Sequence, residues 1–156
     1  MSIERARAHL RKYGFEERIK EFEVSSATVS LAALALGCEE ARIAKTLSFS
    51  LGDQPILIVT AGDAKINNAK YKATFEKKAK MLLFEEVEAL IGHAVGGVCP
   101  FGVNEGVKVY LDKSLLRFDV VYPAAGTAKS AVELTIKELE IAAAPISWVD
   151  VTVVPE

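Results

Sequence analysis

Hydrophobic and polar positions alternate most regularly over residues 42–51, RIAKTLSFSL. The odd-numbered positions from 43 to 51 are apolar except for Lys45, and the even-numbered ones are alanine, threonine or serine. Side chains two positions apart share a face of a strand, so the alternation predicts a strand with one buried face and places Lys45 on that face. After a turn at Gly52 and Asp53, the apolar run of residues 55–61 predicts a second strand, covered on both sides, that pairs with the first as a hairpin.

Helical spacing and capping residues predict the other elements. Residues 2–13 have an amphipathic pattern, and Ser25, Ser26 or Thr28 can cap a helix that ends at Gly37. This second helix is rich in alanine and leucine, so we expect it to be buried. Further helices are predicted over about a dozen residues from Asn67, over residues 85–91, and over residues 136–143 after a Thr135–Glu138 capping box; further strands are predicted near 22–24, 81–84, 107–111, 118–122, 131–134 and 146–154.

The mixture of strands and helices predicts an α/β or α+β fold, and the chain length suits a single domain over residues 1–156. With 51% hydrophobic and 26% charged residues, the chain can bury a sizeable core without disulfides. The first residues, MSIERARAHLRK, are charged where a signal peptide needs an apolar run, and no apolar stretch approaches the ~20 residues of a membrane span. We therefore expect a cytoplasmic protein without membrane contact.

Charge is unevenly distributed along the chain. Residues 63–80 contain six lysines and two acids, a local charge of +4, whereas the net charge of −2 leaves −6 for the remainder. A lysine-rich helix is commonly a solvated face, but its contrast with an acidic remainder also suits a polyanionic partner. No aromatic ladder accompanies the lysines, so contact with the end of a nucleic acid fits better than wrapping of a long single strand.

Lys45 is the first candidate for chemistry. An ammonium on the apolar face of a strand must reach solvent at the sheet edge, pair with an acid or line a cavity, because burial of an unpaired charge is costly. If Lys45 reaches solvent at the sheet edge, it is an ordinary surface lysine. If it lines a cavity, it is a fixed cation that could hold a phosphate or stabilise developing oxyanion charge.

The loop of residues 96–102, GGVCPFG, is the second candidate. Its adjacent glycines allow a close backbone approach that a Cβ would forbid, and its amides could face a carbonyl oxygen or carboxylate; alternatively the loop is only a tight turn. Cys99 with His93 also invites a nucleophile–base interpretation, although no orienting carboxylate is identifiable. The two cysteines and two histidines lack metal-ligand spacing, and no nucleotide-binding fingerprint occurs, so we expect neither metal nor cofactor.

Four segments together resemble the YbaK/EbsC family, which is related to the editing (insertion) domain of bacterial prolyl-tRNA synthetase. They are IAKTLSF with Lys45, GDAKINNAKYK, AVGGVCPFG with its Gly96-x-x-x-Pro100 spacing, and AAGTAKSAVELT, and they cover roughly residues 24–140. The resemblance implies a mixed, largely antiparallel sheet that forms a partly open barrel surrounded by helices. It also implies a trans-acting deacylase for mischarged tRNA, with the 3′ acceptor end of the tRNA as partner and prolyl-tRNA synthetase as a candidate second partner.

The resemblance also assigns roles to residues. Lys45 matches the functional lysine of the family, expected to engage the terminal adenosine and orient the ester. The loop Gly96, Gly97, Val98, Cys99 and Pro100 is expected to hold the aminoacyl group and position water, so that no protein nucleophile is required. The residues expected to bind substrate are Thr28, Asp63, Lys70, Phe101, Gly102, Gly126 and Thr127.

One position departs from the family pattern: Cys99 stands where the family often has serine, which replaces a hydroxyl with a weaker thiol donor. Cysteine-specific members have an acidic residue at the position that corresponds to Ala131 here, and the nearest acid in this chain is Glu133, two residues further on. A preference for Cys-tRNA is therefore not expected. Two other functions stay open at this point. One is a non-catalytic protein that binds tRNA ends or a synthetase, and the other is an acyl hydrolase that uses Cys99.

Overall fold

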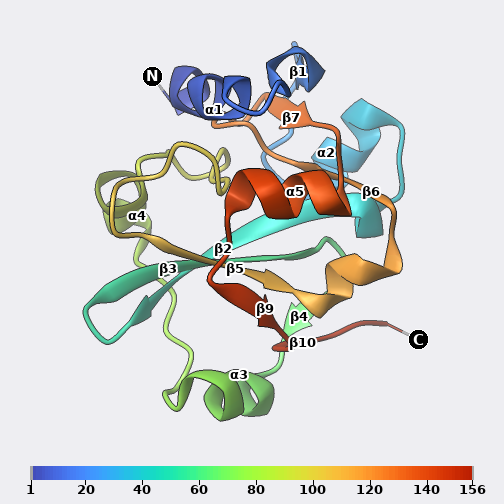
Figure 1. The fold of residues 1–156 in the computed structure, drawn as a ribbon. Helices are drawn as coiled ribbons and strands as arrows, with labels where there is room; N and C mark the ends of the chain where they lie inside the picture. Colours follow the sequence, from blue (N-terminus) through green and yellow to red (C-terminus); the bar gives the residue numbers. More distant parts are fainter. Residues whose placement is uncertain (1, 156) are drawn as a thin grey trace.

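A six-stranded mixed sheet organises the protein, which the computed structural model describes over residues 2–155. The strand order is β8-β6-β2-β3-β5-β9, and the sheet is strongly twisted and curls into a partly open barrel (Figure 1). Its strands are β2 (Ile43–Leu51), β3 (Gln54–Ala61), β5 (Lys108–Asp112), β6 (Val120–Pro123), β8 (Leu134–Thr135) and β9 (Ser147–Val149). Two short antiparallel pairs flank it: β1 (Ile19–Glu21) with β7 (Ser130–Val132), and β4 (Lys65–Ile66) with β10 (Thr152–Val153).

The predicted hairpin is confirmed, because β2 and β3 pair antiparallel from Ala44↔Ala61 to Leu51↔Gln54. The β2–β6, β3–β5 and β5–β9 pairings are parallel. The sheet is therefore mixed, as expected: the β2–β3 and β6–β8 pairings are antiparallel, and the other three are parallel. The reason is that helices and long loops connect β3 to β5 and β5 to β9, and such crossovers return the chain in the same direction.

Five α-helices surround the sheet in the described chain: α1 (Ser2–Arg11), α2 (Val29–Leu36), α3 (Asn68–Phe75), α4 (Phe84–Ile91) and α5 (Ile136–Ala143). A 3-10 helix, η3 (Lys113–Arg117), follows β5. The predicted caps are present at Thr28, Asn67 and Thr135. The helix α3 is shorter than expected because Glu76 adopts a left-handed conformation, with φ +61°, that ends it. No helix within residues 2–155 is both long and apolar enough to cross a lipid bilayer.

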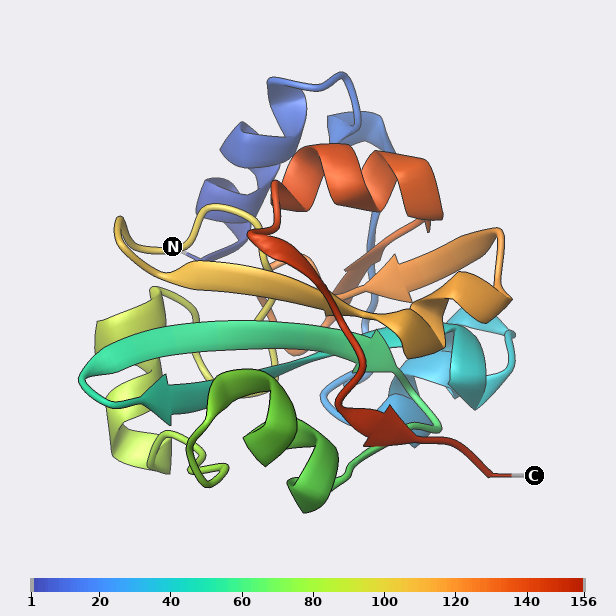
Figure 2. The same cartoon turned by 60° about the horizontal axis from the view of Figure 1, so that its bottom comes forward.

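Of the three hydrophobic clusters among the described residues, two cover the two faces of the sheet. The larger one packs α1 and α5 against residues such as Leu57 and Leu111, and the smaller one packs Tyr71 of α3 against Phe49 and Ile58. Figure 1 accordingly shows α1 and α5 on one side of the sheet and α3 on the other, and α3 comes to the front in Figure 2. The central hairpin is therefore enclosed from both sides.

Burial was predicted less well than element type. The even-numbered side of β2 was expected to face solvent, but Ala44 and Ser48 are buried, because loops and helices cover this face too. The helix α2 was expected to be buried, but Leu34 is 80% exposed and the buried positions are Ala32 and Ala33. Alternation or spacing shows which residues share a face, but not whether another element covers that face.

Two expected strands also differ. The strand placed near residues 22–24 lies three positions earlier, at Ile19–Glu21, where it pairs with β7. Residues 81–84 form no strand, and their only ladder contact among the described residues is the bridge between Phe49 and Met81. Both segments are too short for their sequence pattern to define a register.

Candidate active site

A cavity of about 470 Å³ opens beside β2. Its walls come from the start of α2, from β2, from α4 and the segment before it, from the loop at residues 95–98, and from β6 and β7 with the start of the turn between them. Most of the lining is apolar, as in small-ligand sites of similar size, and hydroxyl groups of Ser26, Thr46 and Ser130 add a few polar points. Segments more than 80 positions apart in sequence thus meet around one space.

Lys45 is the only charged residue among the described residues that line this cavity. Its Nζ donates to the carbonyl oxygens of Gly62, at 3.5 Å, and Ala64. Partial burial lowers the pKa of Lys45; the nearby Asp63 carboxylate opposes this shift, and Lys65 adds to it. Of the three outcomes considered for this lysine, the structure shows the one in which it lines a cavity.

The glycine loop reaches the cavity through Gly96 and Val98. Gly96 has φ +95°, a conformation that other residues rarely adopt. A Cβ on Gly97 would lie 2.5 Å from the backbone carbon of Gly126 and from the backbone nitrogen of Thr127. The paired glycines therefore let the loop touch the turn at 126–127, and Gly97, Gly126 and Thr127 support the cavity wall without lining it.

The second half of the loop turns into the protein. Cys99 and Phe101 have no exposed surface, and Pro100 is also buried. Gly102 packs on α1, where an added Cβ would lie 2.5 Å from the carbonyl oxygen of Arg5. None of these four residues lines the cavity, although the resemblance assigned them to the site. They anchor the loop from behind.

Cys99 and His93 are close in space, with 3.6 Å between Sγ and Nε2. Complete burial raises the pKa of Cys99 to about 12, and burial lowers the pKa of His93. His93 Nε2 also lies 2.6 Å from the carbonyl oxygen of Phe101. A buried, protonated thiol is a poor nucleophile, so the geometry argues against the Cys99 hydrolase.

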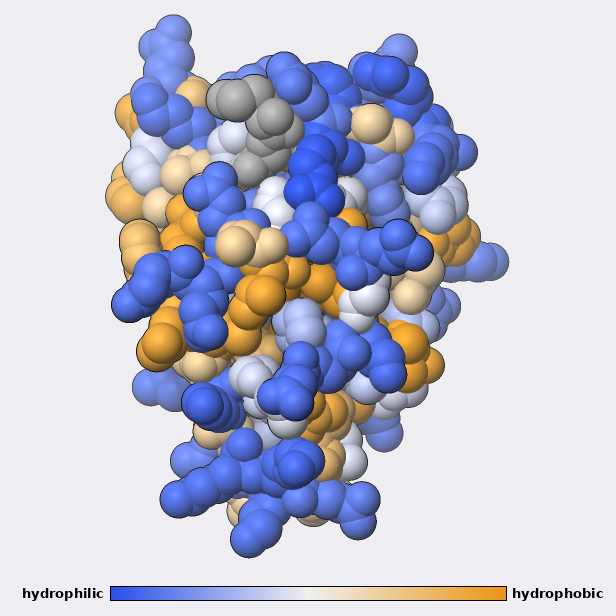
Figure 3. All heavy atoms as spheres, turned by 90° about the vertical axis from the view of Figure 1, so that its left-hand side faces the viewer, coloured by the Kyte–Doolittle hydropathy of each residue, from blue (hydrophilic) through white to orange (hydrophobic). Residues whose placement is uncertain are grey.

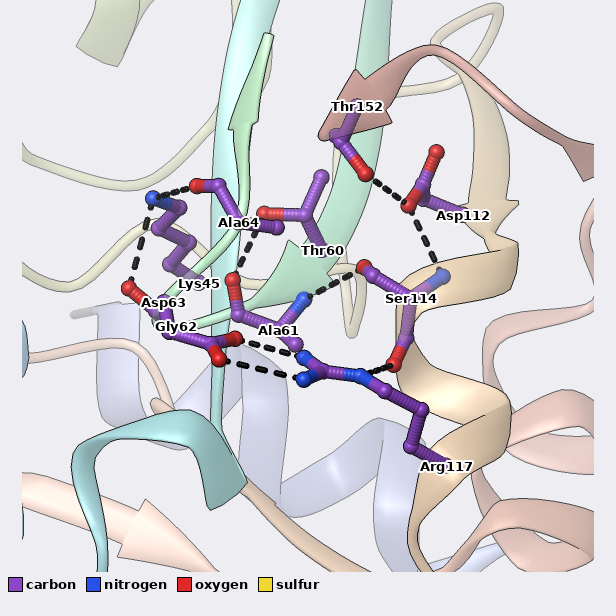
Figure 4. Close-up of polar contacts among 10 residues, drawn as sticks. All are labelled: Lys45, Thr60, Ala61, Gly62, Asp63, Ala64, Asp112, Ser114, Arg117 and Thr152. Carbon is purple, nitrogen blue, oxygen red and sulfur yellow. Dashed lines mark hydrogen bonds and ion pairs between the residues drawn. The ribbon is translucent and has the colours of Figure 1, made fainter. Parts of the chain in front are cut away.

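Thr28 both lines the cavity and caps α2, since its Oγ1 accepts from the backbone N–H of Leu31 at 3.1 Å. Asp63 and Lys70 do not line the cavity, and each is held by another group. Asp63 accepts two hydrogen bonds from Arg117 (Figure 4), and Lys70 donates to Asp150 and to the carbonyl oxygen of Thr152. Direct binding of substrate by these two side chains is therefore not favoured by the geometry.

Several residues of the cavity gave no sequence signal. Met81, Phe84 and Val95 line it and remain 55%, 75% and 47% exposed, so they form an apolar rim. Hydrophobic surface gathers across the middle of the face in Figure 3, the side on which α4 lies in Figure 1, and hydrophilic residues cover its lower end. These residues are isolated in the sequence, and only the fold brings them together as a rim. Their exposure in the structure is the signal that indicates it, and the sequence does not contain that signal.

Metal ligands are absent from the part of the chain that the structure describes, in that no three His, Cys, Asp or Glu side chains there are placed to hold a metal ion. The hydroxyl oxygen of Thr46 is a different kind of feature. It is buried and has no hydrogen-bond partner among the described residues, and Thr46 lines the cavity. Within residues 2–155 it therefore lacks the hydrogen-bond partner that a buried hydroxyl usually has.

Comparison with known proteins gives a consistent result. Residues 23–141 match the family described as "Aminoacyl-tRNA editing domain". The chain is 51% identical over 152 residues to the uncharacterized protein YwhH of Bacillus subtilis, and the match covers 97% of each chain. It is 31% identical to an Enterococcus faecalis protein named "Putative Cys-tRNA(Pro)/Cys-tRNA(Cys) deacylase EbsC", over 73% of this chain and 72% of that one.

Two further similarities extend this picture. A proline–tRNA ligase of Streptococcus equi is 29% identical over 69% of this chain, which corresponds to only 17% of the ligase. A solved structure described as "a putative trans-editing enzyme for prolyl tRNA synthetase" superposes with a TM-score of 0.87 at 30% identity, and the match covers 97% of both chains. The fold is therefore shared along nearly the whole length.

Proposed function

The chain belongs to the aminoacyl-tRNA editing domain family, and from this we propose that it is a trans-acting deacylase that hydrolyses the ester between a wrong amino acid and the 3′ end of a tRNA. A synthetase pocket sized for one amino acid rejects similar or smaller ones poorly, because a missing methylene is worth only about 1–3 kcal/mol. A second, hydrolytic site removes the errors. We propose tRNA for proline, mischarged with a small amino acid, as the substrate, and the cytoplasm as the location.

The observation that supports this proposal most directly is Lys45 on one wall of the cavity and the Gly96–Val98 segment on another. An ammonium in a partly buried site interacts strongly with a phosphate or a developing oxyanion, because the surroundings are less polar than water. In the proposed mechanism Lys45 holds the terminal adenosine and orients the ester, and the loop positions the aminoacyl group opposite it.

The attacking group in this mechanism is water or a group of the substrate itself. Among the described residues that line the cavity, none is a cysteine, histidine, aspartate or glutamate. An aminoacyl ester is already activated, so orientation and charge stabilisation can supply most of the acceleration. The apolar walls and the absence of a lining carboxylate suit a small side chain without charge.

The lysines of α3 and of the segment that follows give the tRNA a place to bind. Lys72, Lys77, Lys78 and Lys80 are exposed, and Lys80 directly precedes Met81 on the cavity rim. We propose that these lysines contact phosphates of the acceptor end while the terminal nucleotide enters the cavity. A complex with prolyl-tRNA synthetase would present the substrate directly and is a second expected interaction.

The test is loss of ester from tRNA charged with alanine, cysteine, serine, threonine or proline. We expect faster loss with at least one mischarged tRNA, and a decrease of on the order of 100-fold in Lys45→Ala, because it removes the fixed cation. Lys137→Ala on α5, which is exposed and does not line the cavity, is the matched control. Binding of charged tRNA without ester loss would instead identify a non-catalytic binding protein.

A further inference from the structure

We propose that Asp63 and Arg117 are positioning residues that hold the turn at residues 62–64 in the shape that places the Lys45 ammonium at the cavity. The inference deepens the proposed function and rests on it, since it assigns a role in the same site to two residues that do not line the cavity. The turn follows β3, whereas Arg117 ends η3, 54 positions further along the chain.

The Lys45 ammonium is held by the two residues that flank Asp63 in the sequence. Its Nζ donates to the carbonyl oxygens of Gly62 and Ala64, so the direction of the ammonium depends on the backbone that carries the Asp63 side chain. This side chain points away from Lys45 and receives both terminal nitrogens of Arg117, with 3.1 Å between Nη1 and Oδ2 (Figure 4). A two-point contact of this kind fixes orientation as well as distance.

Arg117 is itself immobilised. Its Nε donates to the carbonyl oxygen of Ser114 at 2.9 Å, and its guanidinium carbon lies 4.9 Å from the centre of the Phe118 ring. The hydroxyl of Ser114 also accepts from the backbone N–H of Ala61 at 3.0 Å, so η3 holds the end of β3 at Ala61 and the following turn at Asp63.

A buried carboxylate anchors η3 in turn. Asp112, which is 1% exposed, accepts from the backbone N–H groups of Ser114 and Val151 and from the hydroxyl of Thr152. The backbone of Gly62 also packs closely on residue 40, because a Cβ on Gly62 would lie 2.0 Å from the carbonyl oxygen of Glu40. The turn is thus held at Gly62 as well as at Asp63. In Figure 4, Asp63 is the residue of the turn whose side chain is held, and Arg117 holds it.

Charge gives the pair a second effect on the lysine. Partial burial disfavours the ammonium, and the Asp63 carboxylate raises the pKa of Lys45 against this effect, whereas Lys65 lowers it. Loss of the Asp63 charge should therefore let the pKa of Lys45 fall further. Loss of Arg117 leaves the carboxylate in place, so it should disturb the turn without lowering that pKa.

The experiment compares Asp63→Asn, Arg117→Gln and Arg117→Lys in deacylation of a tRNA that the wild-type protein hydrolyses, across pH. We expect both Asp63→Asn and Arg117→Gln to reduce kcat about 10- to 100-fold, because small displacements of a catalytic group have effects of this order. The alkaline limit of activity should move to lower pH in Asp63→Asn only. Arg117→Lys, which keeps the charge but cannot form the two-point contact, should recover part of the activity.

Glu21→Gln is the matched control. Glu21 lies on β1 and forms an exposed ion pair with Arg7 at 3.1 Å, which this substitution removes. A direct NMR titration of Lys45 in the wild type, Asp63→Asn and Arg117→Gln tests, without an activity assay, whether the pKa of Lys45 falls only in Asp63→Asn. The inference is overturned if Asp63→Asn and Arg117→Gln fold normally and keep wild-type kcat and pH dependence. Absence of deacylation by the wild-type protein would instead overturn the proposed function.

Discussion

At Gly97 two loops from separate parts of the sequence come into close backbone contact. The atoms that an added Cβ would meet belong to the backbone of Gly126 and Thr127, so neither can rotate away as a flexible side chain would. The neighbouring positions Gly96 and Val98 line the cavity. A change at Gly97 therefore reaches the cavity wall although the residue does not touch the space itself.

For Gly97→Ala we predict a loss of about 1–3 kcal/mol in the free energy of unfolding and a decrease in deacylation, because the loop must move to admit a methyl group. Denaturant unfolding and single-turnover kinetics measure the two effects. Gly14→Ala is a suitable comparison, since Gly14 has φ +80° but nothing within 4 Å of an added Cβ. Gly14→Ala should also lose stability, because alanine is strained at this φ, so the two variants are compared in deacylation. An equal decrease in deacylation would contradict the close contact at Gly97.

At this scale the sequence predicted some site residues and could not predict others. Lys45 was recognisable because a cation at an apolar position of a strand needs an explanation. The partner of Asp63 was not, because Arg117 reaches it only through the packing of η3 against β3. Cys99 resembled a site residue in the linear motif, yet the chain turns inward after Val98 and buries it.

Helix caps connect the element scale to the site. Thr28 caps α2 and Thr135 caps α5, each through a hydroxyl that accepts from a backbone N–H at 3.1 Å. Only Thr28 lines the cavity. The two threonines therefore make the same kind of local contact in different surroundings, which separates a capping role from a role in the site.

For Thr28→Ala and Thr135→Ala we predict similar losses of roughly 1 kcal/mol in the free energy of unfolding, since each removes one cap. Only Thr28→Ala should also reduce deacylation, and Thr28→Ser should restore both stability and activity. Thermal unfolding and ester hydrolysis measure these effects. If Thr28→Ala and Thr135→Ala are equally active, Thr28 serves only the helix.

Elements were predicted better than their surroundings. The hairpin, the caps of three helices and the capping box follow from local residue types and were confirmed. The exposure of Leu34 and the parallel pairing of β2 with β6 depend on how separate segments meet, which local patterns do not encode.

At the scale of the whole molecule, the uneven charge becomes a spatial arrangement. The exposed lysines follow α3 and lead to the cavity rim at Met81, whereas most acids lie elsewhere in the sequence. Phosphate contacts at such a surface are expected to depend strongly on salt, because each contact releases counterions.

For the double variant Lys77→Gln and Lys78→Gln we predict weaker binding of charged tRNA and a smaller salt dependence. The log–log slope should fall by about 1 for each phosphate that a lysine no longer neutralises. Hydrolysis of a short aminoacyl ester should be unchanged, because neither lysine lines the cavity. Lys12→Gln on the α1 side is the control. Equal salt slopes for all three proteins would place the tRNA elsewhere.

The cavity walls also have a consequence for biosynthesis. They combine residues from Ser26 to Ala131, and β2 must find β6 nearly 80 positions later in the chain. Contacts of such long sequence separation form late. Because the chain is synthesised from the N-terminus, β2 cannot pair with β6 until β6 has been synthesised. A nascent chain on the ribosome would therefore expose the β2–β3 hairpin before the segments that enclose it emerge, so chaperone capture is expected at that stage.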